Sequence, residues 1–256
     1  IKNEEFIFFL KIKKKLSKLP PKKYAGLLNI LRFNGLFIEI QVYIKGKNAY
    51  HHLLEDSLND DLFKKIIEKR IEMNSRLPSS IKNRMSVYEL IEKKFSKMFF
   101  LSFKEKKEIN KLISVVDRKI ILRPQHGDFC LYNIIVDGQK ISFVDWDNYG
   151  NVTIPFFDFY YLFFSKLFGS IGNNHPEIVQ KTLSKNPNMI KQVFDNKILK
   201  KSLKMIGEKD SKINRIIFIM SVIIQMNQVK FKKHNQWIKI WLFILSTIIE
   251  EGSIYD

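Results

Sequence analysis

Two short apolar runs joined by an Asp-Gly pair constrain the fold of this chain more than any other feature of its sequence. Residues 134–136 and 141–144 are rich in β-branched and aromatic side chains, which favour β-strands. Asp137 and Gly138 between them predict a hairpin, because glycine adopts the positive φ that a tight turn requires. We therefore expect an antiparallel pair whose open end brings together the residues just before the first strand and just after the second.

The open end of this hairpin carries side chains that suit a divalent cation. Asn133 directly precedes the first strand and Asp145 directly follows the second, so we expect them to lie side by side. Amide and carboxylate oxygens are the ligands that Mg²⁺ prefers. Asp128 lies one short loop upstream, where a carboxylate can accept a proton from an attacking hydroxyl. Each residue alone is ordinary in a polar loop, and only their joint spacing indicates phosphoryl transfer.

The segment 126–158 resembles the core of the aminoglycoside phosphotransferase and choline kinase superfamily. That family's pattern runs His-Gly-Asp, a spacer, Asn, a hairpin, Asp-Trp, and then Gly, Pro and Asp before a helix. The matching residues here are His126, Gly127, Asp128, Asn133, Asp145, Trp146, Gly150, Pro155 and Asp158. The resemblance implies that Asp128 is the catalytic base and that Asn133 and Asp145 are Mg²⁺ ligands. It also implies that Asp158 braces the catalytic loop.

The same resemblance implies an α+β, protein-kinase-like fold with two lobes. Residues 1–45 would form the remnant of a small nucleotide-binding lobe, a helix plus a β-hairpin. Residues 46–256 would form a mostly helical large lobe that carries the catalytic loop at 123–158. The adenine of ATP, or the guanine of GTP in its place, would meet backbone groups at Val42 and Ile44. An edge strand without a ligand accounts for those two residues equally well.

The first residues of the chain depart from the kinase pattern. A kinase small lobe covers the phosphates with a glycine-rich loop and a strand lysine, whereas no glycine precedes Gly26 and no Gly-x-Gly occurs in this sequence. We expect a truncated small β lobe, with Glu4 or Glu5 as the helix acid that pairs with the missing lysine, and an inactive fragment. A rival placement makes residues 6–12 the phosphate strand and Lys11 its lysine, which leaves no room for the small-lobe helix.

Hydrophobic spacing predicts the remaining elements. Before the catalytic loop, the pattern indicates a helix at 3–18, strands at 26–33 and 36–44 joined at Asn34-Gly35, and a helical region at 49–115. After the loop, it indicates helices at 155–168, 176–184, 187–205, 211–231 and 235–251. We expect the aromatic residues between Phe156 and Phe164 to form core rather than a ligand cage.

The charge and the cysteine content limit the partners and the cellular compartment that we expect for this protein. The 256 residues carry a formal net charge of +18, from 44 Lys and Arg against 26 Asp and Glu. The basic residues are spread along the chain with abundant Ile, Asn and Phe, as an A/T-rich coding region produces, so we expect no specific nucleic-acid partner. The single cysteine, Cys130, cannot form an internal disulfide, which favours the cytoplasm. We expect neither a nucleophilic Cys130 nor a metal-binding His126, which would instead brace the loop.

Apolar runs are too short for a membrane segment. Residues 217–226 and 241–249 fall well below the roughly 20 residues that cross a bilayer, so they fit buried helices better.

The charge of the C-terminal part is the main indication of which class of acceptor is phosphorylated. The C-terminal part is acidic only at Glu250, Glu251 and Asp256, which disfavours a polycationic aminoglycoside. A neutral or anionic acceptor, such as a sugar or a cell-envelope precursor, fits better. Choline would require an aromatic cage, for which Trp146, Tyr149 and the Phe-rich helix are candidates.

The resemblance therefore predicts an ATP- and Mg²⁺-dependent phosphotransferase that moves a γ-phosphate to a hydroxyl of a small molecule. The candidate acceptors are a sugar or cell-envelope precursor, choline and an aminoglycoside. The alternative is a non-catalytic kinase-like module that binds a nucleotide or a partner. A basic nucleic-acid-binding protein is a third hypothesis, which leaves the arrangement of Asp128, Asn133 and Asp145 unexplained.

Overall fold

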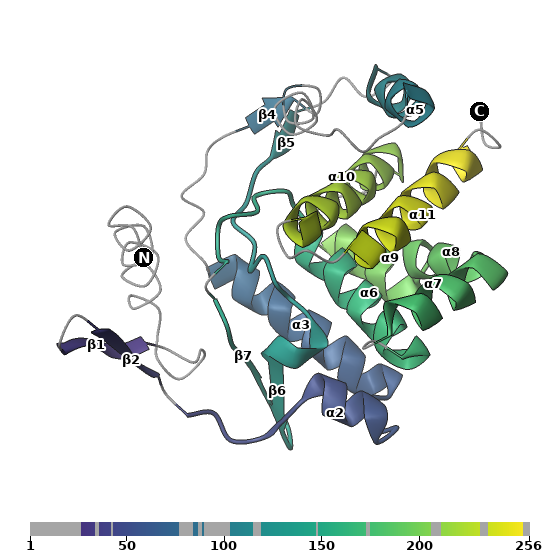
Figure 1. Ribbon diagram of the computed structural model, residues 1–256. Helices are drawn as coiled ribbons and strands as arrows, with labels where there is room; N and C mark the ends of the chain where they lie inside the picture. Colours follow the sequence, from purple (N-terminus) through teal and green to yellow (C-terminus); the bar gives the residue numbers. More distant parts are fainter. Residues whose placement is uncertain are drawn as a thin grey trace. The chain divides into compact units, whose positions relative to one another are not determined.

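The chain is of the α+β class, mostly helical, with a small antiparallel sheet of three strands (Figure 1). The computed structural model describes residues 27–33, 36–41, 43–76, 84–86, 89, 103–114, 119–146, 148–172, 175–205, 211–230 and 235–252. Contacts divide the chain into two compact units. The first unit consists of residues 1–78 and 126–152, and the second of residues 79–125 and 153–256. The predicted hairpin and the loop before it thus belong to the first unit.

The three-stranded sheet of the first unit is built on the predicted hairpin. Strands β6 (Ile134–Asp137) and β7 (Lys140–Phe143) pair antiparallel, with Ile134 opposite Phe143. Gly138, in the turn between them, has a φ of 59°, which an L-residue adopts only with strain. The predicted hairpin and its turn are therefore confirmed.

The other edge of β6 pairs with a strand that the sequence does not predict. Strand β3 (Lys47–Asn48) gives the order β3-β6-β7 and is too short to show any periodicity. Gly46, just before it, has a φ of 132°, and a Cβ atom there would lie 2.5 Å from the carbonyl oxygen of Val136. Only glycine allows the two backbones to approach this closely.

The second predicted hairpin is also present. Strands β1 (Leu27–Phe33) and β2 (Leu36–Gln41) pair antiparallel, with Phe33 opposite Leu36. Strand β2 ends at Gln41 rather than at 44, and residues 43–45 have no regular structure. The turn at Asn34-Gly35 and the predicted helix at 3–18 lie outside the described residues.

Two helices complete the described part of the first unit. Helix α2 (Ala49–Leu54) and helix α3 (Asp60–Arg76) begin after Asn48 and Asn59, whose side-chain oxygens accept hydrogen bonds from backbone N–H groups of their first turns at 2.8 and 2.9 Å. The buried face of α3 follows the i, i+3, i+4, i+7 spacing of an amphipathic helix. Its members are Phe63, Ile66, Ile67, Arg70 and Met73.

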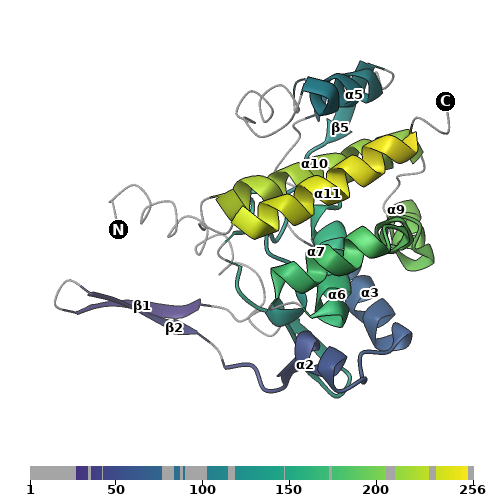
Figure 2. The ribbon, with the colours of Figure 1, turned by 45° about the vertical axis from the view of Figure 1, so that its right-hand side comes forward.

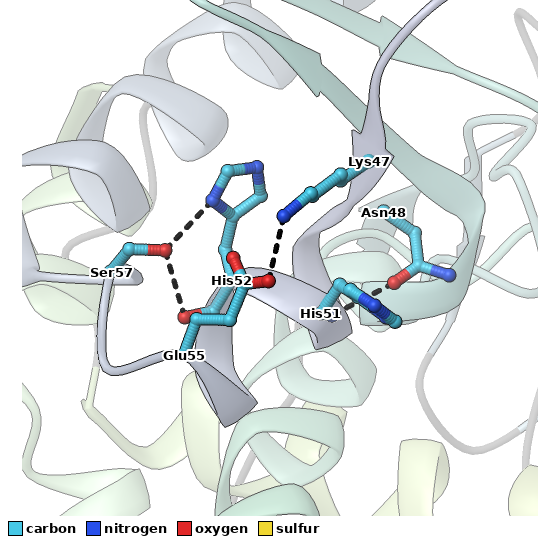
Figure 3. A network of polar contacts seen from close by, with 6 residues as sticks. All are labelled: Lys47, Asn48, His51, His52, Glu55 and Ser57. Atoms are coloured by element: carbon cyan, nitrogen blue, oxygen red, sulfur yellow. Dashed lines mark hydrogen bonds and ion pairs between the residues drawn. The ribbon is translucent and has the colours of Figure 1, made fainter.

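A polar network ties the end of α2 to the start of the sheet (Figure 3). The Ser57 hydroxyl lies 2.8 Å from ring Nδ1 of His52 and donates to the His52 carbonyl oxygen at 3.1 Å. The backbone N–H of Leu58 donates to the same carbonyl oxygen. Lys47 Nζ lies 2.7 Å from Glu55 Oε1, and this hydrogen bond holds the pKa of Glu55 below its ordinary value. The network links β3 to α2.

The second unit consists mainly of helices. It contains α5 (Phe103–Ser114), α6 (Phe157–Ile171), α7 (Pro176–Lys185), α8 (Asn188–Phe194), α9 (Lys197–Met205), α10 (Ser211–Lys230) and α11 (Asn235–Gly252). Helices α10 and α11 lie side by side (Figures 1 and 2). The predicted helices at 155–168, 176–184, 211–231 and 235–251 are therefore confirmed to within a few residues at their ends.

Two predictions for the second unit are wrong. The single helix expected at 187–205 is two helices, because Asn196 begins a new one: its side-chain oxygen accepts from the backbone N–H of Ile198 at 2.9 Å. The helical region expected at 49–115 contains strand β4 (Arg84–Ser86), which pairs with β5 (Lys119–Ile121). Three residues are too few to separate strand from helix by spacing.

Aromatic side chains form the core between α6, α10 and α11. The ring of Phe164 lies 5.5 Å from that of Phe218 and 5.1 Å from that of Trp241, and Phe168 lies 5.3 Å from Trp241. All four residues are buried, which confirms that the Phe-rich helix is core. No helix in the described parts of the chain is both long and apolar enough to cross a membrane.

Replacing Gly46 should destabilise the protein more than replacing another glycine of positive φ. Gly46→Ala forces a Cβ atom against the Val136 carbonyl, and we expect a loss of about 3 kcal/mol or more in the free energy of unfolding. Gly138→Ala is the control, because a Cβ atom there meets nothing within 4 Å and the loss should be about 1–2 kcal/mol. Urea unfolding of both variants measures the difference, and equal losses would contradict it.

Candidate active site

The loop before β6 is held by hydrogen bonds to one carbonyl oxygen. The backbone N–H of Cys130 donates to the carbonyl oxygen of Asp128 at 3.0 Å, and the Asn133 side-chain Nδ2 donates to the same oxygen at 2.8 Å. Residues Leu131–Asn133 form one turn of 3₁₀ helix, η2, that leads directly into β6. These bonds fix the spacing between Asp128 and Asn133, which are both half-buried.

Asn133 lies across from the end of β7, as the hairpin predicts. The backbone N–H of Val144 donates to the Asn133 carbonyl oxygen at 3.0 Å, which extends the β6–β7 pairing toward the loop. Asp145 is the next residue, and it is exposed. Because Asn133 uses its amide nitrogen to hold the loop, its amide oxygen is the atom that can act as a ligand. A residue with an amide oxygen and a residue with an exposed carboxylate therefore stand at the same end of the hairpin.

These oxygens fit Mg²⁺ better than a transition metal. Among the residues that the structure describes, no three His, Cys, Asp or Glu side chains gather as a metal site. Mg²⁺ does not require such a cluster, because one or two protein ligands, water and substrate phosphates complete its shell. The roles of Asn133 and Asp145 as ligands stay predictions that the donor set suits.

Asp145 has an unusual backbone conformation. Its φ of 56° lies in the left-handed region, where Asp is tolerated better than most side chains. Residues held in such conformations are enriched at functional sites.

His126 joins the start of the loop to the end of β7. The residue is fully buried, and its ring Nε2 lies 2.8 Å from the carbonyl oxygen of Val144. A carbonyl oxygen only accepts, so Nε2 carries the proton. The imidazole also packs on Trp146, with ring centres 4.4 Å apart, and Trp146 Nε1 donates to the Phe143 carbonyl oxygen at 3.0 Å. These contacts agree with a bracing role for His126.

Arg70 is the principal residue of this region that sequence reasoning missed. It is fully buried on α3, and its guanidinium carbon lies 5.4 Å from the ring centre of Phe129 and 5.8 Å from that of Trp146. Both distances are typical of cation–π contacts. The sequence signal that could have identified it is an arginine at an apolar position of an amphipathic helix.

The aromatic cage suggested for choline at Trp146 and Tyr149 is wrong. Trp146 is 4% exposed and Tyr149 is 9% exposed, with ring centres 5.6 Å apart. The Arg70 guanidinium already lies over the Trp146 ring. The Phe-rich helix is equally unsuited, because its aromatic side chains are core.

Gly127 is required by close packing as well as by its backbone angle. Its φ is 85°, and a Cβ atom at this position would lie 2.7 Å from the carbonyl oxygen of Asn148. The turn after Asp145 therefore packs directly against the backbone that precedes Asp128.

Cys130 is not suited to nucleophilic chemistry. Burial raises the pKa of its thiol to about 12, and the nearby Asp128 carboxylate adds to the shift. The thiol is therefore protonated at neutral pH.

The remaining predicted site residues are Val42, Ile44 and Asp158. Val42 lies outside the described residues, and Ile44 is half-buried in the irregular segment before β3. Asp158 is fully buried in the first turn of α6, in the second unit. Adenine binding by Val42 and Ile44 and loop bracing by Asp158 stay predictions.

No protein-family model and no curated protein matches this sequence. The resemblance to kinases therefore depends on residues 126–158.

Alkylation should reveal the environment of Cys130. Iodoacetamide at pH 8 should modify Cys130 about 100-fold more slowly in the folded protein than in urea, because the thiolate is scarce at a pKa of about 12. Asp128→Asn should speed the folded-state reaction by removing a negative charge. Mass spectrometry over time measures both rates, and equal rates in folded and unfolded protein would contradict the prediction.

Proposed function

We propose that this protein is an ATP- and Mg²⁺-dependent phosphotransferase of kinase-like fold that phosphorylates a hydroxyl of a small molecule. One observation carries the proposal. Asn133 and Asp145 stand at the same, open end of the β6–β7 hairpin, and the Asn133 side chain is hydrogen-bonded to the backbone of Asp128. A base and two oxygen ligands in this relation are what phosphoryl transfer requires of a catalytic loop.

In this proposal Asp128 orients the acceptor hydroxyl and takes its proton. The acceptor oxygen forms a bond to the γ-phosphorus while the bond from that phosphorus to the bridging oxygen of ADP breaks, so ADP leaves with the electron pair. Asn133 and Asp145 would hold Mg²⁺, which when bound neutralises charge on the phosphates. The two hydrogen bonds to the Asp128 carbonyl oxygen support this role, because they hold the backbone that carries the base.

A non-catalytic kinase-like module is the second candidate. It predicts nucleotide binding without transfer of phosphate.

Removal of the Asp128 carboxylate tests the proposal directly. In protein made from the complete reading frame, Asp128→Asn should lower kcat for γ-phosphate transfer by about 100-fold or more, with nucleotide binding retained. Asp137→Asn is the matched control, because this carboxylate lies at the opposite end of β6, and its activity should stay near wild type. Radiolabelled phosphate transfer measures both variants. An Asp128→Asn variant with full activity would exclude the base, and a wild type that binds ATP without transfer would favour the second candidate.

Loss of the Asp145 carboxylate should weaken Mg²⁺ binding, so that transfer requires a higher Mg²⁺ concentration. Asp145→Asn should raise the Mg²⁺ concentration for half-maximal transfer by about tenfold or more, about 1.4 kcal/mol, because a neutral amide replaces a charged oxygen ligand of the cation. Transfer rates over a Mg²⁺ titration measure this shift, with Asp137→Asn again as control. An unchanged Mg²⁺ dependence would show that Asp145 is not a ligand.

A further inference from the structure

Arg70 is a buried cation that contacts both halves of the candidate site. Its side chain is fully buried on α3, and its guanidinium carbon lies 5.4 Å from the ring centre of Phe129 and 5.8 Å from that of Trp146. Phe129 directly follows Asp128, and Trp146 directly follows Asp145. One side chain of α3 therefore contacts the residue next to the proposed base and the residue next to a proposed Mg²⁺ ligand.

Packing alone does not require a charge at this position of the core. The other buried side chains that the structure describes on α3 are apolar: Phe63, Ile66, Ile67 and Met73. A methionine has about the length of an arginine, fills irregular space in a core and avoids the free-energy cost of burying a charge. What Arg70 supplies beyond packing is the attraction of a cation for the faces of two aromatic rings.

Both rings are themselves held in place. Trp146 Nε1 donates to the Phe143 carbonyl oxygen at 3.0 Å, which fixes the indole at the end of β7. Phe129 is fully buried, and its ring centre lies 5.0 Å from that of Phe143. All of these residues belong to the first unit, as does Arg70. Movement of either ring would therefore shift the backbone beside it.

We infer that Arg70 is a positioning residue of the proposed phosphotransferase. Its guanidinium attracts the faces of both rings and so holds the loop before β6 and the residues after β7 against α3. Asp128 and Asp145 then keep a constant spacing, which transfer needs because the acceptor and the phosphate must meet in line. This role depends on the proposed function, since it takes Asp128 as the base and Asp145 as a ligand. Arg70 acts on the reaction indirectly, through the two rings.

Hydrogen exchange measures how firmly Arg70 holds the loop, without any substrate. The backbone N–H groups of Asn133 and Val144 donate to the carbonyl oxygens of Cys130 and Asn133. In Arg70→Met, which keeps the length and loses the charge, these two amides should exchange about tenfold faster or more, through loss of desolvated cation–π contacts. Amides of α10 in the second unit should keep their rates. Arg70→Lys keeps a charge and should stay within about threefold of wild type.

A transfer assay tests whether this positioning matters for the reaction. With ATP and the acceptors glucose, choline and kanamycin, in protein from the complete reading frame, Arg70→Met should lower kcat by about tenfold or more. It should also raise the Mg²⁺ concentration for half-maximal transfer, whereas a simple loss of folded protein would leave that concentration unchanged. Lys69→Met is the matched control. It removes the neighbouring charge on α3, which is paired with Glu72 at 2.7 Å, and should change neither quantity.

A second substitution tests the same contact from the side of the loop. Phe129→Leu keeps an apolar residue in the core and removes the ring face, so it should also speed exchange at Val144. Combined with Arg70→Met, it should speed exchange by less than the product of the two single effects, because both substitutions remove one contact. Effects that multiply would contradict the role of the guanidinium. Phe129→Leu also supplies the test if Arg70→Met does not fold.

The outcomes separate the positioning role from the proposed function. Unchanged exchange at Asn133 and Val144 in Arg70→Met, or an equal rise in α10, would overturn the positioning role and leave the phosphotransferase standing. Faster exchange at these two amides with unchanged kcat would do the same. A wild-type protein that binds no ATP would overturn the phosphotransferase, while faster exchange in Arg70→Met would still support the contact of Arg70 with the loop.

Discussion

The antiparallel pairing of β6 with β7 is the constraint on which the candidate site depends. The turn at Gly138 sets the register at one end, and the hydrogen bond from Val144 to Asn133 extends it at the other. Ile134 and Phe143, opposite each other and buried, hold the same register from within. A slip of one residue would turn both side chains to the wrong face and separate Asn133 from Asp145. The register of β6 against β7 thus determines both the core packing of this sheet and the geometry of the candidate site.

The buried side chain of Arg70 packs against the loop before β6 and the residues after β7. Burial of an arginine is costly unless its charge is compensated, and the faces of Phe129 and Trp146 offset part of that cost for Arg70. The imidazole of His126 packs on the same Trp146 ring, so α3, the loop and the end of β7 share a single packed cluster. Such a cluster resists movement of the loop, which is what a preorganised catalytic carboxylate needs.

The sequence was sufficient to predict those helices and strands whose formation depends on residues close together in the chain. The Asp137-Gly138 turn and the spacing of apolar residues were sufficient for the β6–β7 hairpin and for most helices after residue 155. The break at Asn196 was missed because an Asn cap inside an apolar pattern is a weak signal. The burial of Arg70 and of Trp146 was missed for a different reason. Each depends on a partner far away in the sequence, which periodicity within one helix or strand does not register.

The position of a bound metal ion tests the proposed site most directly. Mn²⁺, added in place of Mg²⁺ with a non-hydrolysable ATP analogue, broadens the NMR signals of nearby amides. We predict strong broadening at Asn133 and Asp145, with much weaker broadening at Gly138 at the far end of the same hairpin. Asp145→Asn should reduce the broadening at Asn133. Equal broadening at Gly138, or broadening confined to another part of the chain, would contradict the claim that the hairpin builds a metal site at its open end.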